Sequence, residues 1–308
     1  MTVAVSDHKA AIETHDLRKR FGARAAVDGL SMAIPVGTVT GFVGPNGAGK
    51  TTTIRLLLGL VRPQGGSGSV LGYPLDEPAR YLPRVGALIE APAFYPSLSG
   101  RTNLDVLARL GAYPRQRIDD VLAVVELGDR ARDRVQTYSQ GMKQRLGVAM
   151  ALLPDPDLLI LDEPANGLDP VGIVQMRDLL RQLRDRGKTI FLSSHVLGEL
   201  ERVVDWVVML DNGKALFSGP VRTFLDQGSE LVVESGDAHQ LAVAAGIARA
   251  AGYTAVPEER AVRISCPLDF AAELKRRAAD AGAPEISIRA REVTLEERFL
   301  ALLRKEAP

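Results

Sequence analysis

Residues 44–52 read GPNGAGKTT, and this stretch decides how the rest of the chain is interpreted. Two glycines that are separated by four residues and followed by Lys-Thr are typical of a phosphate-binding loop, in which successive backbone N–H groups point into one concavity. An apolar run precedes the stretch at residues 39–43, and a helix-like segment follows it at residues 54–58. A plain glycine-rich turn is the alternative interpretation. The strand–loop–helix context favours a site for the phosphates of a nucleotide.

The side chains of this loop have separate expected tasks. We expect Lys50 to place its charge on the β- and γ-phosphates and Thr51 to offer a hydroxyl ligand to Mg²⁺. Asn46 adds a donor beside the γ-phosphate. The predicted nucleotide-binding residues of the loop are Gly44, Pro45, Asn46, Gly47, Ala48, Gly49, Lys50, Thr51 and Thr52.

A second stretch with chemical meaning, LLILDEP at residues 158–164, ends in two carboxylates. Its apolar residues predict a strand that is buried on both faces of a parallel sheet, and ligands bind at the carboxyl ends of such strands. We expect Asp162 to hold Mg²⁺ directly or through water, and Glu163 to polarise an attacking water. A solvated acidic turn is the alternative, and the phosphate loop argues against it.

The residues alone do not decide the roles of three further positions. Phe21 is either a core aromatic or a platform on which a base stacks. Ser139 begins a helix-like stretch, where it is either a plain N-cap or part of an anion site at a helix N-terminus. His195 follows another apolar strand, and its imidazole is suited to contact with a γ-phosphate.

The composition bounds the classes of protein to consider. With 308 residues, of which 46% are hydrophobic, the chain is long enough for two domains. Lys+Arg and Asp+Glu both number 38, and this neutral balance argues against a nucleic-acid partner. The single cysteine, Cys266, fits a reducing cytosol, and we expect it to be buried. Apolar runs are too short to cross a bilayer, so we expect membrane attachment to come only through a partner.

The order of predicted elements indicates an α/β protein with two domains. Residues 11–227 form the first, with strands near 11–17 and 25–34 and a helical insertion at about 98–152. In the insertion, Leu104, Leu107 and Leu110 recur at helical spacing and predict a core-facing stripe. Residues 228–308 read strand-helix-strand-strand-helix-strand, the order of a small α+β ferredoxin-like domain, followed by a terminal helix. This second domain has no phosphate loop or acid pair, so we expect a packing, dimerising or regulatory role.

Residues 12–225 resemble the ATP-binding subunit of the ATP-binding cassette (ABC) transporters. The most specific likeness is YSQGMKQR at residues 138–145, which is similar to the signature of that family and lies in family order between the phosphate loop and the acid pair. The resemblance implies a phosphate-loop NTPase fold with a mixed sheet and a helical insertion. It also implies an ATPase that uses ATP and Mg²⁺ and couples hydrolysis to transport.

The resemblance gives roles to the open positions. Phe21 matches the aromatic residue that stacks on adenine. Ser139 and Gly141, which flank Gln140, match residues that contact the γ-phosphate of ATP held by the opposite protomer. Asp169 matches the acidic residue of the family that links the two sites of a dimer. His195 matches the switch histidine of the family. With Lys50 and Glu163, His195 completes the predicted catalytic set.

One position departs from the family pattern. Where the family usually has Gln at the end of the strand at residues 85–89, this chain has Glu90. A carboxylate can still bind Mg²⁺, so Glu90 joins Thr51 and Asp162 as a predicted metal ligand. The segment 89–96 resembles the branch of bacitracin and lantibiotic self-protection exporters, and the segment 294–299 is similar to the closing segment of drug-export ATPases.

The resemblance also implies partners. Two copies, or one copy and a close relative, are expected to enclose two MgATP and to move a separate membrane-spanning permease at the inner face of the cell membrane. Glu90 and the helical insertion form the expected docking surface, with Phe94 and Tyr95 as exposed apolar contacts. The alternatives are a mechanical ABC ATPase without a transport role and the ATPase of an importer.

Overall fold

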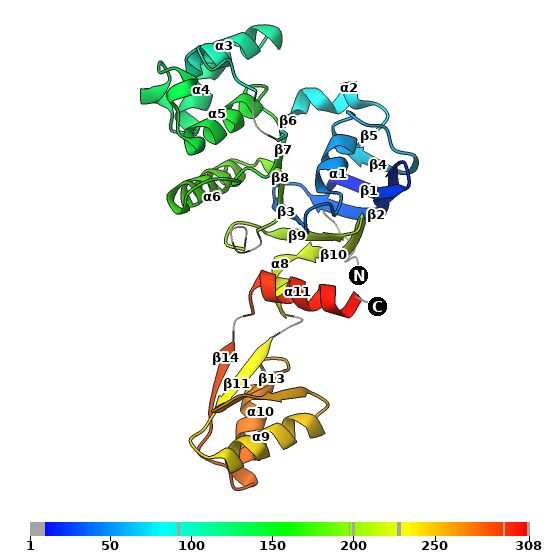
Figure 1. Ribbon diagram of the computed structural model, residues 1–308, viewed down its shortest axis with the longest axis vertical. Coiled ribbons are helices and arrows are strands. Elements are labelled where there is room, and N and C mark those ends of the chain that lie inside the picture. Colours follow the sequence, from blue (N-terminus) through cyan, green and yellow to red (C-terminus); the bar gives the residue numbers. More distant parts are fainter. Residues whose placement is uncertain are drawn as a thin grey trace. The chain divides into compact units, whose positions relative to one another are not determined.

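The computed structural model describes residues 10–90, 93–196, 198, 201–226, 229–291 and 293–306, without the side chains of 226 and 304–306. Contacts divide the chain into two compact units, Met1–Pro220 and Val221–Pro308 (Figure 1). The domain boundary predicted from the sequence, between residues 227 and 228, lies outside the described residues.

The first unit is built on a six-stranded sheet with the strand order β10-β9-β3-β8-β7-β6. All its pairings are parallel except β10 with β9, which forms an antiparallel hairpin. Every residue of β3, β7 and β8 is buried, which explains why these strands read as apolar runs in the sequence. The strands are β3 (Val39–Val43), β6 (Val85–Leu88), β7 (Leu158–Asp162), β8 (Thr189–Ser194), β9 (Trp206–Asp211) and β10 (Lys214–Pro220).

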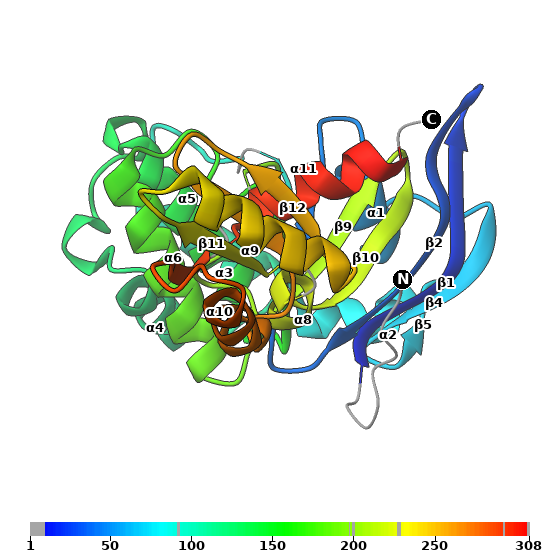
Figure 2. The same ribbon diagram turned by 90° about the horizontal axis from the view of Figure 1, so that it is seen from below.

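A second, antiparallel sheet of the first unit has the order β2-β1-β4-β5 and is visible in Figure 2. Its two long strands exceed the predicted ranges because a turn of only two residues, Gly22 and Ala23, joins them. Phe21 and Arg24 therefore pair directly across the end of the hairpin. The strands are β1 (Ala10–Phe21), β2 (Arg24–Pro35), β4 (Gly65–Val70) and β5 (Tyr73–Pro74).

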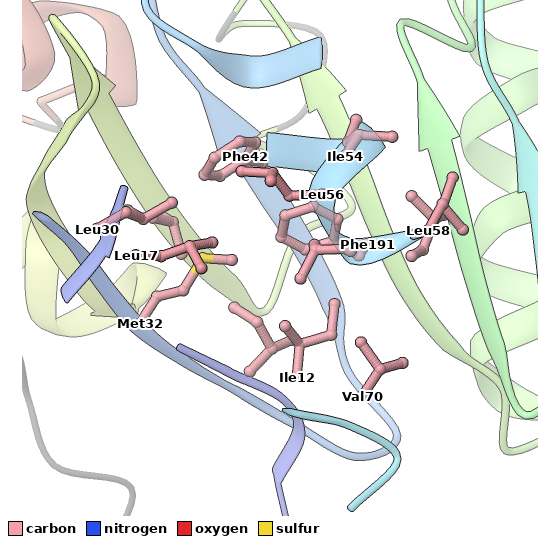
Figure 3. Close-up of a cluster of buried hydrophobic side chains, with 14 of the residues drawn as sticks. Ile12, Leu17, Leu30, Met32, Phe42, Ile54, Leu56, Leu58, Val70 and Phe191 are labelled. Atoms are coloured by element: carbon pink, nitrogen blue, oxygen red, sulfur yellow. The ribbon is translucent and has the colours of Figure 1, made fainter. Parts of the chain in front are cut away.

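Helix α1 (Lys50–Leu57) packs against both sheets and shares one core with them (Figure 3). Its Ile54 and Leu56 meet Phe42 of β3 and Phe191 of β8, whose rings lie 5.0 Å apart between centroids. Each fully buried side chain of this size stabilises the fold by about 1.5–3 kcal/mol. The core thus fixes the start of α1, and with it the loop that joins β3 to α1.

A helical lobe lies beyond β6 at the edge of the central sheet (Figure 1). The predicted leucine stripe is partly wrong: Leu104 is buried, whereas Leu110 is 80% exposed. A spacing of three residues falls 60° short of a full turn, so the second repeat leaves the buried face. Ala108, four residues after Leu104, is buried instead. The helices of the lobe are α3 (Gly100–Leu110), α4 (Gln116–Val124) and α5 (Gln140–Leu152), while α2 (Pro78–Tyr81) and α6 (Pro170–Asp185) flank the sheets.

The second unit contains an antiparallel sheet with the order β12-β13-β11-β14 and two helices packed together, α9 and α10. The observed element order is the strand-helix-strand-strand-helix-strand order expected from the sequence. Cys266 is buried in this unit, and burial raises the pKa of its thiol to about 11. The elements are α8 (Val221–Asp226), β11 (Glu230–Glu234), α9 (Ala238–Ala250), β12 (Thr254–Pro257), β13 (Ala261–Ser265), α10 (Phe270–Asp280), β14 (Ser287–Arg291) and α11 (Leu295–Glu306).

Within the part of the chain that the structure describes, no helix combines the length and the apolar character that a membrane span requires.

Candidate functional site

The phosphate loop lies at the carboxyl end of β3 and opens directly into α1. Its last glycine, Gly49, has φ 108°, and a Cβ atom there would lie 2.2 Å from the carbonyl oxygen of Ala26. Only glycine therefore allows this approach. Gly49 is the N-cap of α1, and no side chain caps the helix. The first N–H groups of α1 are free of side-chain acceptors and can bind an anion.

Lys50 is held across this loop. Its side chain is buried, and Nζ donates a hydrogen bond to the carbonyl oxygen of Gly44 at 2.7 Å. The same Nζ lies 3.6 Å from Oε1 of Glu163, which comes from the end of β7. The two residues predicted as phosphate contact and general base thus face each other.

Asp162 is fixed by two hydroxyl groups. Thr51 Oγ1 donates to its Oδ2 at 3.0 Å, and Ser193 Oγ donates to its Oδ1 at 2.5 Å. Among the described residues, no three His, Cys, Asp or Glu side chains gather into a metal site. The Thr51 hydroxyl and the Asp162 carboxylate nevertheless fit Mg²⁺, which commonly takes one or two protein oxygens and completes its shell with water and substrate phosphates.

Ser193 is a functional residue that sequence reasoning missed. It is fully buried in β8, and its Oγ also accepts a hydrogen bond from the backbone N–H of Glu163 at 2.9 Å. One hydroxyl therefore contacts both the carboxylate of Asp162 and the backbone of Glu163 at the end of β7. The signal in the sequence was the first polar residue after the apolar residues 190–192, where the strand reaches the site.

Glu163 and His195 leave the ends of the neighbouring strands β7 and β8 and meet there. Nδ1 of His195 lies 2.7 Å from Oε2 of Glu163. Glu163 has φ 50°, a left-handed backbone conformation that is uncommon for a residue with a side chain and is concentrated at functional sites. A carboxylate held between a lysine and a histidine is suited to orient a water molecule.

A cleft of about 650 Å³ joins these groups to the β1–β2 hairpin. This volume is typical of a site for a small organic ligand. Phe21 is 53% exposed at the cleft, so the core interpretation of this residue is wrong, and Lys19 Nζ lies 5.4 Å from its ring centroid. The lining includes three residues that sequence reasoning missed, Arg24, Ala26 and Asn166. The lining residues are Phe21, Arg24, Ala26, Asn46, Gly47, Gly49, Lys50, Thr51, Thr52, Glu163, Asn166 and His195.

The stretch at residues 139–141 lies apart from this cleft. Ser139 is the N-cap of α5, and its Oγ accepts a hydrogen bond from the N–H of Met142 at 3.2 Å. Ser139 and Gln140 are exposed, and among the described residues that line the cleft none belongs to 139–141. Asp169 is likewise the N-cap of α6, and its Oδ1 accepts a hydrogen bond from the N–H of Gly172 at 2.8 Å.

Glu90 follows β6, with φ 56°, and its carboxylate pairs with the guanidinium of Arg55 on α1. Glu90 is absent from the described lining of the cleft, so its predicted role as a Mg²⁺ ligand would require the side chain to turn. Phe94 is half-buried and Tyr95 is 59% exposed. Residues 91 and 92 of the segment that resembles peptide exporters lie outside the described residues.

Comparison with known proteins gives one consistent result. The family model described as "ABC transporter" matches residues 27–166. The bacitracin transport ATP-binding protein BcrA of Bacillus licheniformis is 47% identical over 208 residues, which cover 67% of this chain and 68% of BcrA. The lantibiotic transport ATP-binding protein SrtF of Streptococcus pyogenes is 38% identical over 205 residues, which cover 67% of this chain and 89% of SrtF.

Solved structures agree with the sequence relatives. The structure of an ATP-binding subunit of an ABC transporter superposes with a TM-score of 0.62 at 30% identity, covering 70% of this chain and 91% of that chain. An ATP-binding cassette of an ABC transporter in its ADP conformation gives a TM-score of 0.64 at 21% identity, covering 70% and 92%, and supports the fold.

Proposed function

The chain belongs to the ABC transporter family as an ATP-hydrolysing, ATP-binding subunit, and from that premise we propose that it powers the export of an antibiotic peptide or drug through a separate membrane permease. The likeness to proteins named for bacitracin and lantibiotic transport supports this class of cargo. Attachment to the permease holds the subunit at the inner face of the cell membrane. Glu90 and the helical lobe form the proposed docking surface, where Tyr95 offers an exposed apolar contact.

The observation that carries the catalytic part is the contact of Glu163 with both Lys50 and His195, at 3.6 Å and 2.7 Å. Lys50 and the N–H groups of α1 bind the phosphates, while Phe21 stacks on adenine. Glu163 accepts a proton from the attacking water, and His195 orients the carboxylate and contacts the γ-phosphate. Thr51 and Asp162 would hold Mg²⁺, and the ion would supply positive charge beside the phosphates.

A second copy completes each site in this proposal. Ser139 and Gly141 lie at the start of α5, where Ser139 is exposed and Gly141 is half-buried, and neither lines the cleft of its own chain. In a dimer, these residues reach the γ-phosphate held by the partner, and Asp169 links the two sites. Bound ATP contacts both halves only in the closed dimer, so its differential affinity shifts the equilibrium towards closure. Hydrolysis removes the γ-phosphate contact and reopens the pair.

The catalytic assignment is tested by Glu163→Gln. The amide keeps the size of the side chain but cannot accept the proton, so we expect ATP binding to persist and turnover to fall by about 10²–10⁴-fold. Glu285→Gln, at an exposed glutamate of the second unit, is the control and should leave turnover unchanged. Near-normal phosphate release by Glu163→Gln would show that another group is the base.

The transport assignment needs the membrane partner. The first step of the test is to identify a multi-span membrane protein that co-purifies with the chain. The two proteins are then co-expressed, and solute flux is measured in membrane vesicles. ATP-dependent movement of a peptide antibiotic out of the cytoplasmic side, lost in the Glu163→Gln variant, is the expected result. Movement in the opposite direction would identify an importer, and co-purification with ribosomes or DNA instead would contradict transport.

A further inference from the structure

Arg24 lies beside the predicted adenine platform. It is the cross-strand partner of Phe21 at the end of the β1–β2 hairpin. Residues directly opposite each other in an antiparallel pair have side chains on the same face of the sheet. Both residues line the 650 Å³ cleft, so the guanidinium and the Phe21 ring border the same space.

Arg24 also contacts the phosphate loop itself. Its Nη2 donates a hydrogen bond to the carbonyl oxygen of Gly47 at 2.8 Å. Gly47 has φ 82°, and a Cβ atom there would lie 2.6 Å from Arg24 Nη2. The guanidinium therefore lies directly against the backbone of the loop at residue 47. The left-handed backbone there favours glycine.

The charge of Arg24 is uncompensated within the cleft. Lys50, the other cation of the lining, lies 3.6 Å from the Glu163 carboxylate. Arg24 is exposed, and it forms no ion pair with any carboxylate of the described residues. A guanidinium has five N–H donors, and the bond to Gly47 uses one of them. The remaining donors border a cleft that already holds a phosphate loop.

We propose that Arg24 is a nucleotide-binding residue that bridges the two halves of the site, with one donor on the Gly47 carbonyl and the others on the phosphate chain of ATP. This inference rests on the proposed nucleotide site. Arginine suits the task because its planar fork can serve a carbonyl and a phosphate oxygen together. Its position opposite Phe21 sets the spacing between the base platform and the phosphate loop.

The test compares Arg24→Met with Arg20→Met, using ATP as the probe. Arg20 is the matched control because it is exposed on the same hairpin, donates to the carbonyl oxygen of Ala23 at 2.7 Å and is absent from the described cleft lining. Loss of a charge-assisted hydrogen bond should raise the Kd of ATP about 10-fold or more in Arg24→Met. Arg20→Met should change the Kd less than about twofold, as is usual for substitutions away from such contacts.

Salt dependence separates a phosphate contact from a purely structural role. If the Arg24 charge attracts phosphates, the difference between wild type and Arg24→Met should shrink as ionic strength rises, because ions screen exposed charges. Arg24→Lys keeps the charge and should recover part of the affinity. The proposal would be overturned if Arg24→Met lost the same affinity for ATP at every salt concentration, or if Arg24→Lys recovered none of it. Arg24 would then only stabilise the conformation of the loop.

Failure of this inference is distinct from failure of the nucleotide site. If wild type and Arg20→Met bind ATP and Arg24→Met binds it equally well, Arg24 is not a ligand contact while the site stands. If the wild-type chain does not bind ATP at all, the proposed function itself falls.

Discussion

Two helix N-termini of the first unit, those of α1 and α5, differ in how their backbone donors are used. The start of α1 follows a glycine loop, has no side-chain cap and lies in a cleft with Lys50 and Glu163. The start of α5 is capped by Ser139, whose Oγ accepts the N–H of Met142, and it is exposed on the helical lobe.

The two helix ends therefore suit different partners. An uncapped N-terminus beside the chain's own acid, lysine and histidine can bind a phosphate group within a single chain. An exposed, capped N-terminus has fewer free donors and adds a hydroxyl, so it is suited to complete a site presented by another molecule. The proposed dimer uses one end of each kind at every ATP.

The largest combined effect, on ATP binding and on turnover, is expected from breaking the loop at α1. Gly49→Ala forces a Cβ atom against the carbonyl oxygen of Ala26, at 2.2 Å in the present geometry, so the loop must shift. Displacement of about 1 Å can reduce catalysis by about 10²-fold, and we expect at least this loss in turnover together with weakened ATP binding. Calorimetric ATP binding and phosphate release measure both.

The matched control for this change is Gly128→Ala, because a Cβ atom there meets nothing within 4 Å. It should leave binding and turnover unchanged. Normal ATP affinity in Gly49→Ala would mean that the loop does not depend on the close approach to Ala26.

Ser139→Arg should abolish turnover but spare the binding of ATP to a single chain. The new side chain puts a cation at the positive end of α5 and blocks the approach of a partner's nucleotide. Since Ser139 lies outside the described cleft lining, ATP binding at low protein concentration should stay within about twofold, as is usual for exposed substitutions. Loss of binding in the isolated chain would contradict the separation between the two helix ends.

A smaller effect is expected from Ser139→Ala. Removing an N-cap hydroxyl lowers the free energy of unfolding by about 1 kcal/mol. Ser99 makes the same bond for α3, with Oγ accepting from the N–H of Thr102 at 3.1 Å, so Ser99→Ala should destabilise the fold equally. The turnover rate distinguishes the two variants. Ser139→Ala should also lower turnover about tenfold, because it removes one hydrogen bond to a charged group. Equal turnover in the two variants would reduce Ser139 to a cap.

The smallest effect concerns the anchoring of α5 at its other end. Lys188 Nζ donates to Oδ1 of Asp155, just beyond the helix, and this hydrogen bond holds the pKa of Asp155 below its ordinary value of 3.8. A lowered pKa means that the stabilisation is present above pH 3.8 and is lost as pH falls through the folded-state pKa.

Because the Asp155 carboxylate is largely exposed and solvent screens the pair, Asp155→Asn should lower the free energy of unfolding at pH 7 by only about 0.5 kcal/mol. Denaturant unfolding at pH 7 and in acid measures the difference between the variant and wild type. A deficit that persists unchanged in acid would point to a cause other than this ion pair.

Much of the fold was predictable because each signal is local. Strands β3, β7 and β8 are buried along their whole length, so each reads as an apolar run, and residues 44–52 have the spacing that a phosphate loop requires. The Leu110 prediction was wrong because a spacing of three residues drifts around a helix. Strand β1 was underestimated because none of its residues 18–21 is buried, so no core-facing apolar residue marks this end of the strand.

Single stretches of sequence contain the chemistry at the ends of individual strands: a phosphate loop after β3, an acid pair after β7 and a histidine after β8. Which of these groups contact one another follows from how the strands pack. Ser193 reaches Asp162 and Glu163 because β7 and β8 pair in register, and Arg24 reaches Gly47 because the β1–β2 hairpin lies against the loop. Periodicity encodes the burial of one element, whereas contacts between elements depend on packing and strand register, which no single stretch of sequence contains.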